Sequence, residues 1–302
     1  MPSAYNDLDR PPLDEHRLQR ALMVPGEFVA ALRILPEVDS TNTALLAAAA
    51  DGAPHASVLV AEAQTAGKGR LGRAWVAPPR SGLFLSILLR PEVPPSRWGW
   101  LPLLAGVAAR SAVNRVAELD VSLKWPNDLI VPDSDGDPDA DPDTEDSDSG
   151  NAPPEHPYGA GRKLGGILVE QGGAPDAPYV VVGIGINVTL RTNELPAPHA
   201  TSLALAGAAV TDRDTLLRVL LRTFGSWYAD WAGSDGDAER SGLAAAYRAS
   251  CASLDRAVRA ELPGGAAVSG QATDLDAQGR LLIRAPDGTV TPIGAGDVVH
   301  LR

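Results

Sequence analysis

"AGKGRLGRAW", residues 66–75, decides whether the chain contains a Rossmann fold. Its glycines at 67, 69 and 72 have the G-x-G-x-x-G spacing of a dinucleotide-binding turn. The loop follows the apolar run "VLV" (58–60), which predicts a strand. A Rossmann turn requires a helix that begins within the glycines, so that helix amides face the pyrophosphate. Here two prolines and the apolar run "GLFLSILLR" (82–90) follow, which predicts a second strand. The sequence therefore argues against a Rossmann turn at this position.

The same loop also differs from a P-loop, because Lys68 is followed by Gly69 rather than by Ser or Thr. What remains is a flexible loop between two strands that carries Lys68, Arg70 and Arg73. These side chains, and not only the backbone amides, can bind an anion. The alternative interpretation is a surface hairpin with incidental basic residues.

The residues around this loop predict an α/β domain followed by a small all-β domain. Strand patterns occupy 56–64, 82–90, 121–131 (interrupted by Pro126), 163–171 and 179–188, and helical patterns occupy 12–33, 97–119 and 212–232. Residues 35–52 predict a short strand, a polar corner and a helix capped by Ser40, Thr41 or Asn42. Thr211 and Asp214 resemble a capping box. From about Cys251, short alternating runs separated by Gly-containing turns predict a β-barrel of about 50 residues.

The charge distribution indicates one unusual segment. The net charge is −12, and ten acidic residues lie within 132–161. This stretch has no Lys or Arg and few apolar side chains. Such a composition predicts a disordered acidic insert, which we interpret as a passive insertion. The single cysteine, Cys251, excludes a disulfide framework, and no apolar run is long enough for a membrane span. The start of the chain does not resemble a secretory signal, so we expect a cytoplasmic protein.

Three more stretches are unusual for a structural role alone: "KWPND" (124–128), "RKLGG" (162–166) and "GIGIN" (183–187). The glycines in the last two allow another group to approach a strand closely. Together with the cationic loop, these stretches predict a sheet surface cleared for a flat ligand, with Lys and Arg at its rim.

In this order, the motifs resemble those of the biotin protein ligase family. The matching residues are Ser40-Thr41-Asn42, Gln64, Gly67 to Arg73, Lys124 to Asp128, Lys163 to Glu170 and Gly183 to Asn187. The resemblance covers roughly 34–302 and implies a catalytic domain similar to that of class II aminoacyl-tRNA synthetases, joined to an SH3-like barrel. It implies an N-terminal extension over 1–33, a catalytic domain over 34–250 and the SH3-like domain over 251–302.

The resemblance implies that ATP activates biotin as biotinoyl-5′-AMP, with Mg²⁺, before transfer to a lysine of a biotin carboxyl carrier domain. It assigns the main catalytic roles to Lys163 and Arg70. The residues that it implies for biotin are Ser40, Thr41, Asn42, Gln64, Lys68, Gly69, Arg70, Lys163, Gly165 and Gly166. Those implied for ATP or the adenylate are Arg70, Arg73, Trp75, Lys124, Asn127 and Asn187.

Several roles stay open at this point. Ser40 or Thr41 can cap the following helix instead of binding the ligand. Lys124 can contact phosphate or pair with Asp128. Asp128 itself is a candidate for magnesium, for the incoming amine or for a structural carboxylate. The loop also departs from the family's usual "GRGRRGR", because Leu71 lacks a charge and Lys68 lacks the planar guanidinium fork.

Two other functions compete with this interpretation. The first is a lipoate or octanoyl ligase of related fold, and the second is a non-catalytic protein that binds biotin or a nucleotide. Only about 33 residues precede the matching region, without a basic recognition helix, so we expect no DNA binding. We expect no membrane partner, and a monomer or a weak homodimer.

Overall fold

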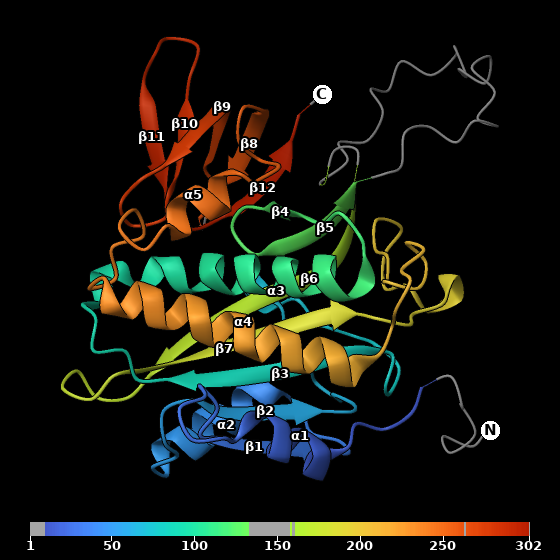
Figure 1. The fold of residues 1–302 in the computed structure, drawn as a ribbon. Helices are drawn as coiled ribbons and strands as arrows, with labels where there is room; N and C mark the ends of the chain where they lie inside the picture. The colour runs from blue at the N-terminus through green and yellow to red at the C-terminus, as the bar shows by residue number, and fades with distance from the viewer. Residues whose placement is uncertain (1–9, 133–157, 159–160, 263, 302) are drawn as a thin grey trace.

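The computed structural model describes residues 10–132, 158, 161–262 and 264–301. Its larger part is built on a seven-stranded sheet with the order β1-β2-β3-β7-β6-β5-β4 (Figure 1). The strands are β1 (Ala31–Leu35), β2 (Ser57–Ala61), β3 (Gly82–Leu89), β4 (Ser122–Lys124), β5 (Asp128–Pro132), β6 (Gly161–Gly172) and β7 (Tyr179–Asn187). Only β1 and β2 pair in parallel, and the other neighbours are antiparallel. The sheet is therefore mixed.

The helices cover the sheet unequally. They are α1 (Glu15–Leu22), α2 (Thr41–Ala50), α3 (Leu101–Ala117), α4 (Arg213–Gly233) and α5 (Leu243–Arg248). The two long helices, α3 and α4, lie side by side in front of the sheet in Figure 1. Their apolar faces and the sheet's inner side form one large core that includes Leu104, Val182 and Phe224. The other face of the sheet is left for α2 and for the loops that follow the strands.

Alternation along β7 decides which side chains reach each face. Val180, Val182 and Ile186 belong to the core beneath α3 and α4. Val181 instead packs with Leu45 of α2 in a second, smaller cluster. The glycines at 183 and 185 continue the Val181 side, so that side becomes bare beyond α2.

A second sheet of five antiparallel strands ends the chain, in the order β11-β10-β9-β8-β12. These strands are β8 (Ala257–Glu261), β9 (Ala267–Leu275), β10 (Leu281–Arg284), β11 (Val290–Ile293) and β12 (Asp297–His300). The fold class is thus confirmed: an α/β part with a mixed sheet, followed by a small all-β part.

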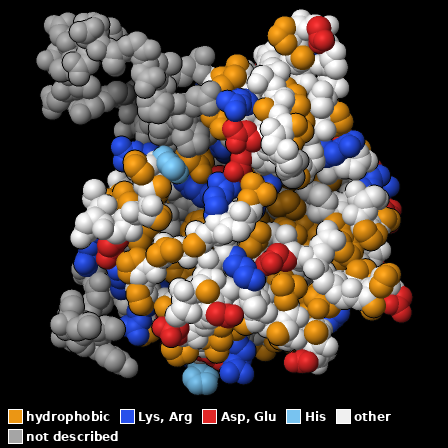
Figure 2. All heavy atoms as spheres, turned by 180° about the vertical axis from the view of Figure 1, so that it is seen from behind, with side chains coloured by type: hydrophobic (Ala, Val, Ile, Leu, Met, Phe, Trp, Pro, Cys, Tyr) orange, Lys and Arg blue, Asp and Glu red, His pale blue; other side chains and the backbone are white. Residues whose placement is uncertain are grey.

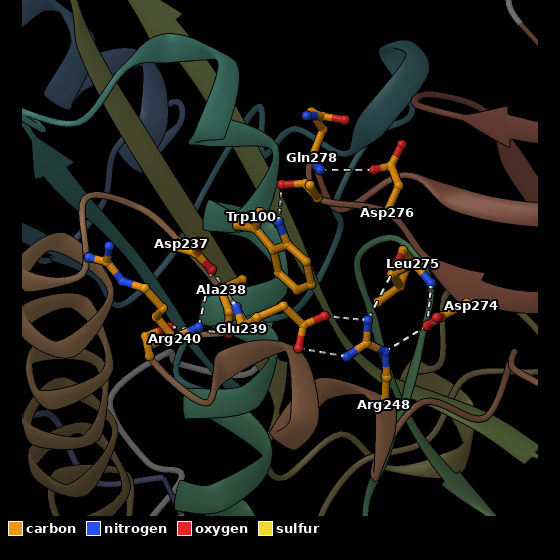
Figure 3. Close-up of polar contacts among 12 residues, drawn as sticks. Trp100, Asp237, Ala238, Glu239, Arg240, Arg248, Asp274, Leu275, Asp276 and Gln278 are labelled. Carbon is orange, nitrogen blue, oxygen red and sulfur yellow. Dashed lines mark hydrogen bonds and ion pairs between the residues drawn. The ribbon is translucent and has the colours of Figure 1, made fainter.

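The turn between β9 and β10 packs against the larger part through polar contacts (Figure 3). The indole of Trp100 donates a hydrogen bond of 3.0 Å to the carbonyl oxygen of Ala277. The guanidinium of Arg248 binds Glu239 and Asp274, and so joins α5 to β9. Trp125 donates from its indole to the carbonyl oxygen of Gly279, at 3.1 Å. The "KWPND" segment is therefore held directly by the C-terminal sheet.

Some local expectations differ from the structure. The helical spacing over 12–33 produces only α1, and β1 starts at Ala31, before the strand expected from residue 35. The cap of α4 is Asp212, whose side chain accepts from the amide of Asp214, rather than a box formed by Thr211 and Asp214. As predicted, the 121–131 strand is interrupted at Pro126, into β4 and β5. The predicted acidic insert falls almost wholly on 133–157 and 159–160, which lie outside the described residues.

Candidate active site

A cavity of about 260 Å³ opens on the sheet face opposite α3 and α4. That side of the molecule is seen in Figure 2, where Lys and Arg side chains gather next to a small group of acidic side chains. Most of the residues predicted for the site line this cavity. They are Ser40, Thr41, Asn42, Gln64, Lys68, Gly69, Arg70, Arg73, Trp75, Asn127, Lys163, Gly166 and Asn187. The structure therefore brings together segments that are more than 140 residues apart in the sequence.

The floor of the cavity consists of glycines on β6 and β7. A Cβ at Gly185 would lie 2.9 Å from the ring of Trp75, and a Cβ at Gly166 would lie 3.2 Å from it. The indole thus lies on the bare strands, in the space predicted for a flat ligand. Its Nε1 is buried and has no hydrogen-bond partner among the described residues.

The loop after β2 forms the rim through paired backbone and side-chain contacts. The amide of Trp75 donates to the carbonyl oxygen of Gly67, at 2.8 Å, so the loop returns to its starting point. Arg70 donates from Nη1 to Oδ1 of Asn127, at 3.0 Å. Arg73 donates from Nη2 to Oδ1 of Asp297 in β12, at 2.9 Å. Burial lowers the pKa of Arg70, and the negative charges of Asp297 and Asp128 oppose that shift.

Lys163 also lines the cavity, near the start of β6. Its Nζ lies 2.7 Å from Oδ1 of Asp128 and 5.8 Å from the ring centroid of Trp75. The hydroxyl of Tyr158 donates to Oδ2 of Asp128, at 3.0 Å. Burial alone would raise the pKa of Asp128, but the charges of Lys163 and Lys124 and the hydrogen bonds outweigh it and hold that pKa below its usual value. Asp128 is therefore a carboxylate that holds the lysine in place.

Three predicted residues do not line the cavity. Gly165 is not among the residues that line the cavity, and a Cβ there would lie 2.6 Å from the carbonyl oxygen of Gly185 and 3.5 Å from Leu129, so its assignment to biotin stays a prediction. Lys124 is buried, and its Nζ lies 4.9 Å above the ring of Tyr158. Asp128 binds Lys163 instead of facing the open space. No group of three or more His, Cys, Asp or Glu residues able to hold a metal ion occurs within the described part of the chain.

The asparagines of the site hold backbone as well as lining the cavity. Asn127 donates from Nδ2 to the carbonyl oxygen of Ile167, at 3.1 Å, while its Oδ1 accepts from Arg70. Asn187 is buried and donates to the carbonyl oxygen of Thr201, at 2.9 Å. Both side chains therefore fix the walls around the floor.

The end of the cavity near α2 is polar. Ser40 caps α2, since its side chain accepts from the amide of Thr43, so one of the two alternatives for Ser40 is confirmed. Gln64 Oε1 accepts from both the amide and the hydroxyl of Thr41, at 2.8 and 3.1 Å. Asn42 donates to the carbonyl oxygen of Leu168 and to the carboxylate of Glu170, at 3.2 and 2.8 Å.

Sequence reasoning missed one wall of the cavity. Tyr158 and His199 both line it, with ring centroids 5.0 Å apart, and the carbonyl oxygen of His199 accepts from the amide of Lys163 at 2.7 Å. Tyr158 lies within the segment interpreted as a passive insertion, so that interpretation does not extend to this residue. Neither residue belongs to a motif, and only the position of Tyr158 five residues before Lys163 could have drawn attention to it.

Comparisons with known proteins identify relatives along the whole chain. The model of the "Biotin/lipoate A/B protein ligase family" matches residues 34–187, and that of the "Biotin protein ligase C terminal domain" matches 253–301. The biotin–[acetyl-CoA-carboxylase] ligase of Mycobacterium tuberculosis is 39% identical over 97% of both chains. The bifunctional ligase/repressor BirA of Escherichia coli is 29% identical over 89% of this chain and 73% of its own length.

Solved structures agree with these matches. The biotin protein ligase from Aquifex aeolicus in complex with biotin and ATP superposes with a TM-score of 0.66 and 27% identity. That comparison covers 90% of this chain and 99% of the Aquifex chain. Among the described residues, no helix is both long and apolar enough to cross a membrane.

Proposed function

Because this chain belongs to the biotin/lipoate A/B protein ligase family, we propose that it activates biotin with ATP and transfers it to a lysine of a biotin carboxyl carrier domain. The intermediate is biotinoyl-5′-AMP. The name of the Mycobacterium relative, biotin–[acetyl-CoA-carboxylase] ligase, supports a carrier domain of a carboxylase as the acceptor.

One observation carries this proposal: Arg70 and Lys163 line the same cavity, above a floor of glycines. In the first step, a carboxylate oxygen of biotin attacks the α-phosphorus of ATP and pyrophosphate leaves. Both reactants are anionic, so cations must offset their repulsion and stabilise the negative charge on the reacting phosphate. Lys163 can turn from Asp128 to an entering anion, and Arg70 approaches from the rim. The two cations thus act on the same anion within one cavity.

In the second step, the amine of the acceptor lysine attacks the carbonyl carbon of the mixed anhydride, and AMP leaves. Water would destroy this intermediate, so the loop that carries Arg70 must cover it until the acceptor arrives. Arg73 and its partner Asp297 support that loop from β12. The C-terminal sheet therefore contributes to retention of the adenylate.

For the nucleotide, Trp75 supplies a flat aromatic face and a buried N–H donor. Asn127 and Asn187 lie along the same floor. The described residues include no group of three or more His, Cys, Asp or Glu side chains that would hold a resident magnesium ion. Asp128 is proposed only as the partner that orients Lys163.

Biotin-dependent exchange between ATP and labelled pyrophosphate tests the first step, and streptavidin detection of a carrier domain tests the second. We expect Lys163→Ala and Arg70→Ala to lose each signal by about 100-fold or more, as for removal of a group that stabilises transition-state charge. Arg240→Ala is the matched control, because this arginine is exposed and its side chain pairs with the exposed Asp235. Exchange with lipoate and none with biotin would replace the proposal by the lipoyl alternative, and no exchange with any acid would leave only a binding protein.

A further inference from the structure

Ser86 is a buried polar residue that no motif includes and that does not line the cavity. It lies in the middle of β3, fully buried, and pairs with Gly183 of β7. Its Oγ lies 2.5 Å from Oδ1 of Asn42 and 2.8 Å from Oγ1 of Thr41. Gly183 leaves the room for this contact, because a Cβ there would lie 2.3 Å from Oδ1 of Asn42.

The partners of Asn42 fix the direction of the first hydrogen bond. A backbone carbonyl and a carboxylate can only accept, so the Asn42 atom that faces Leu168 and Glu170 must be the nitrogen Nδ2. The other side-chain atom, Oδ1, can then only accept. The hydroxyl proton of Ser86 therefore points at Asn42, and its oxygen can only accept from Thr41.

The direction of the next bonds follows. The backbone amide of Thr41 can only donate, so the Gln64 atom that receives it must be the oxygen Oε1. The hydroxyl proton of Thr41 has two protein acceptors, Gln64 Oε1 and Ser86 Oγ. With either acceptor, Thr41 presents only lone pairs to a ligand, and Gln64 presents its Nε2 donors.

We infer that Ser86, acting through Asn42 and Thr41, sets the hydrogen-bond polarity of this end of the cavity for a ligand that places an N–H beside a C=O. A cyclic urea has this edge. The dithiolane of a lipoyl group and the tail of octanoate do not, and their burial here would leave the Nε2 donors of Gln64 and a lone pair of Thr41 without partners. Ser86 is a positioning residue, since it does not reach the ligand itself.

This inference rests on the proposed function, and pyrophosphate exchange separates the two. Ser86→Ala removes the donor to Asn42, and Ser86→Cys replaces it by a weaker one. We expect the KM for biotin to rise about 10-fold in Ser86→Ala and less in Ser86→Cys, as for the loss or weakening of one oriented hydrogen bond. The KM for ATP and the kcat at saturating biotin should stay within about 2-fold, because the polar end does not contact the reacting atoms.

Ser57→Ala is the matched control, since Ser57 is also a buried strand serine with a single side-chain hydrogen bond, to the carbonyl oxygen of Pro54. An unchanged KM for biotin in folded Ser86→Ala overturns the role of Ser86. Equal changes in the KM values for biotin and ATP also overturn it, because they would indicate a general structural defect. Absence of exchange in the wild-type chain would instead overturn the proposed function.

A second experiment uses only the wild-type chain, so its result does not depend on the stability of the variants. Desthiobiotin keeps the urea and lacks the sulfur ring, whereas lipoate and octanoate lack the urea. We expect desthiobiotin to retain a kcat/KM within about 10-fold of that for biotin, and the other two acids to fall by roughly 1,000-fold or more. If the kcat/KM for lipoate equals that for desthiobiotin, the polar end of the cavity does not select for a urea.

Discussion

The two faces of β7 differ in what their side chains do, although the residues alternate along a single strand. Val182 and Ile186 face α3 and α4 and fill the core. Gly183 and Gly185 face the other way and leave space for Asn42 and Trp75. One face therefore stabilises the fold, and the other accommodates the groups that form the site. These glycines therefore allow the close approach of Asn42 and Trp75 rather than a left-handed backbone, because neither of them has a positive φ.

The largest effect is expected from Ile186→Ala on the core face. Ile186 is fully buried, so truncation should lower the free energy of unfolding by about 3 kcal/mol through lost burial and a new cavity. Urea denaturation measures this loss. The KM values for biotin and ATP should not change in the fraction that remains folded. A change in either KM would show that the two faces are not independent.

The neighbouring substitution Gly185→Val tests the other face. Valine favours strands, so the free energy of unfolding should change by less than about 1 kcal/mol. The added side chain would displace the indole of Trp75, since even a Cβ would lie 2.9 Å from the ring. We expect pyrophosphate exchange to fall about 100-fold, because misplacement by about 1 Å can have such an effect. Retained exchange would contradict the assigned role of the glycine floor.

His300 in β12 extends the comparison to the C-terminal sheet. Burial, followed by the positive charges of Lys124 and Arg256, lowers the pKa of this imidazole to about 4. Its Nε2 shares a hydrogen bond of 3.0 Å with Ser253, which accepts from the amide of Trp125 at 3.1 Å. In the unfolded chain this imidazole binds a proton near pH 6.5, whereas in the folded chain it binds one only near pH 4. Stability from this group is therefore full above about pH 6.5 and is lost progressively down to about pH 4.

The measurement is the free energy of unfolding as a function of pH. Between about pH 6.5 and 4, the wild type should lose about 2 kcal/mol more than His300→Gln, which cannot titrate. If the free energy of unfolding depends on pH equally in the two proteins, the folded structure does not hold His300 neutral.

The smallest effect is expected at the ion pair between Arg73 and Asp297. Both side chains are partly exposed, 56% and 35%, so the pair should contribute less than about 1 kcal/mol to stability. Arg73→Ala and Asp297→Ala should each speed release of the adenylate about 2- to 3-fold, and the double variant should add little, because both remove one contact. High salt should reduce the difference from the wild type. Additive effects in the double variant would place the two residues in separate roles.

The sequence predicted much of the fold and most of the cavity for identifiable reasons. Long apolar runs with turn residues between them specified β3, β6 and β7, and the prolines after Trp75 argued against a Rossmann helix. Gly165 and Gly166 were both assigned to biotin, although adjacent residues of a strand face opposite sides. Parity counted from Lys163 favours Gly165, whereas the register shift between β5 and β6 places Gly166 beside the cavity with Lys163. Asn42 was grouped with the ligand-binding residues, whereas its hydrogen bonds serve Ser86, Leu168 and Glu170.

Other parts of the site could not be read from the chain. Ser86 lies in an apolar run, and the packing of α2 against β3 brings it to Asn42, beside Gly183 of β7. Tyr158 and His199 come from segments without a motif and meet beside the start of β6, where the amide of Lys163 donates to the carbonyl oxygen of His199. Such contacts depend on tertiary pairing rather than on local pattern. Asp128 forms its ion pair with Lys163 rather than with Lys124, and this choice is likewise a result of side-chain placement.

The register of β5 with β6 already holds at Pro132 and Gly161, on either side of the acidic stretch. We therefore expect the two strands to stay aligned when the peptide link across 133–157 is cut. A single proteolytic nick there would yield two fragments, one carrying Arg70 and the other Lys163, that share a continuous sheet. Ligase activity recovered on mixing the separated fragments would then be a direct assay of their reassembly.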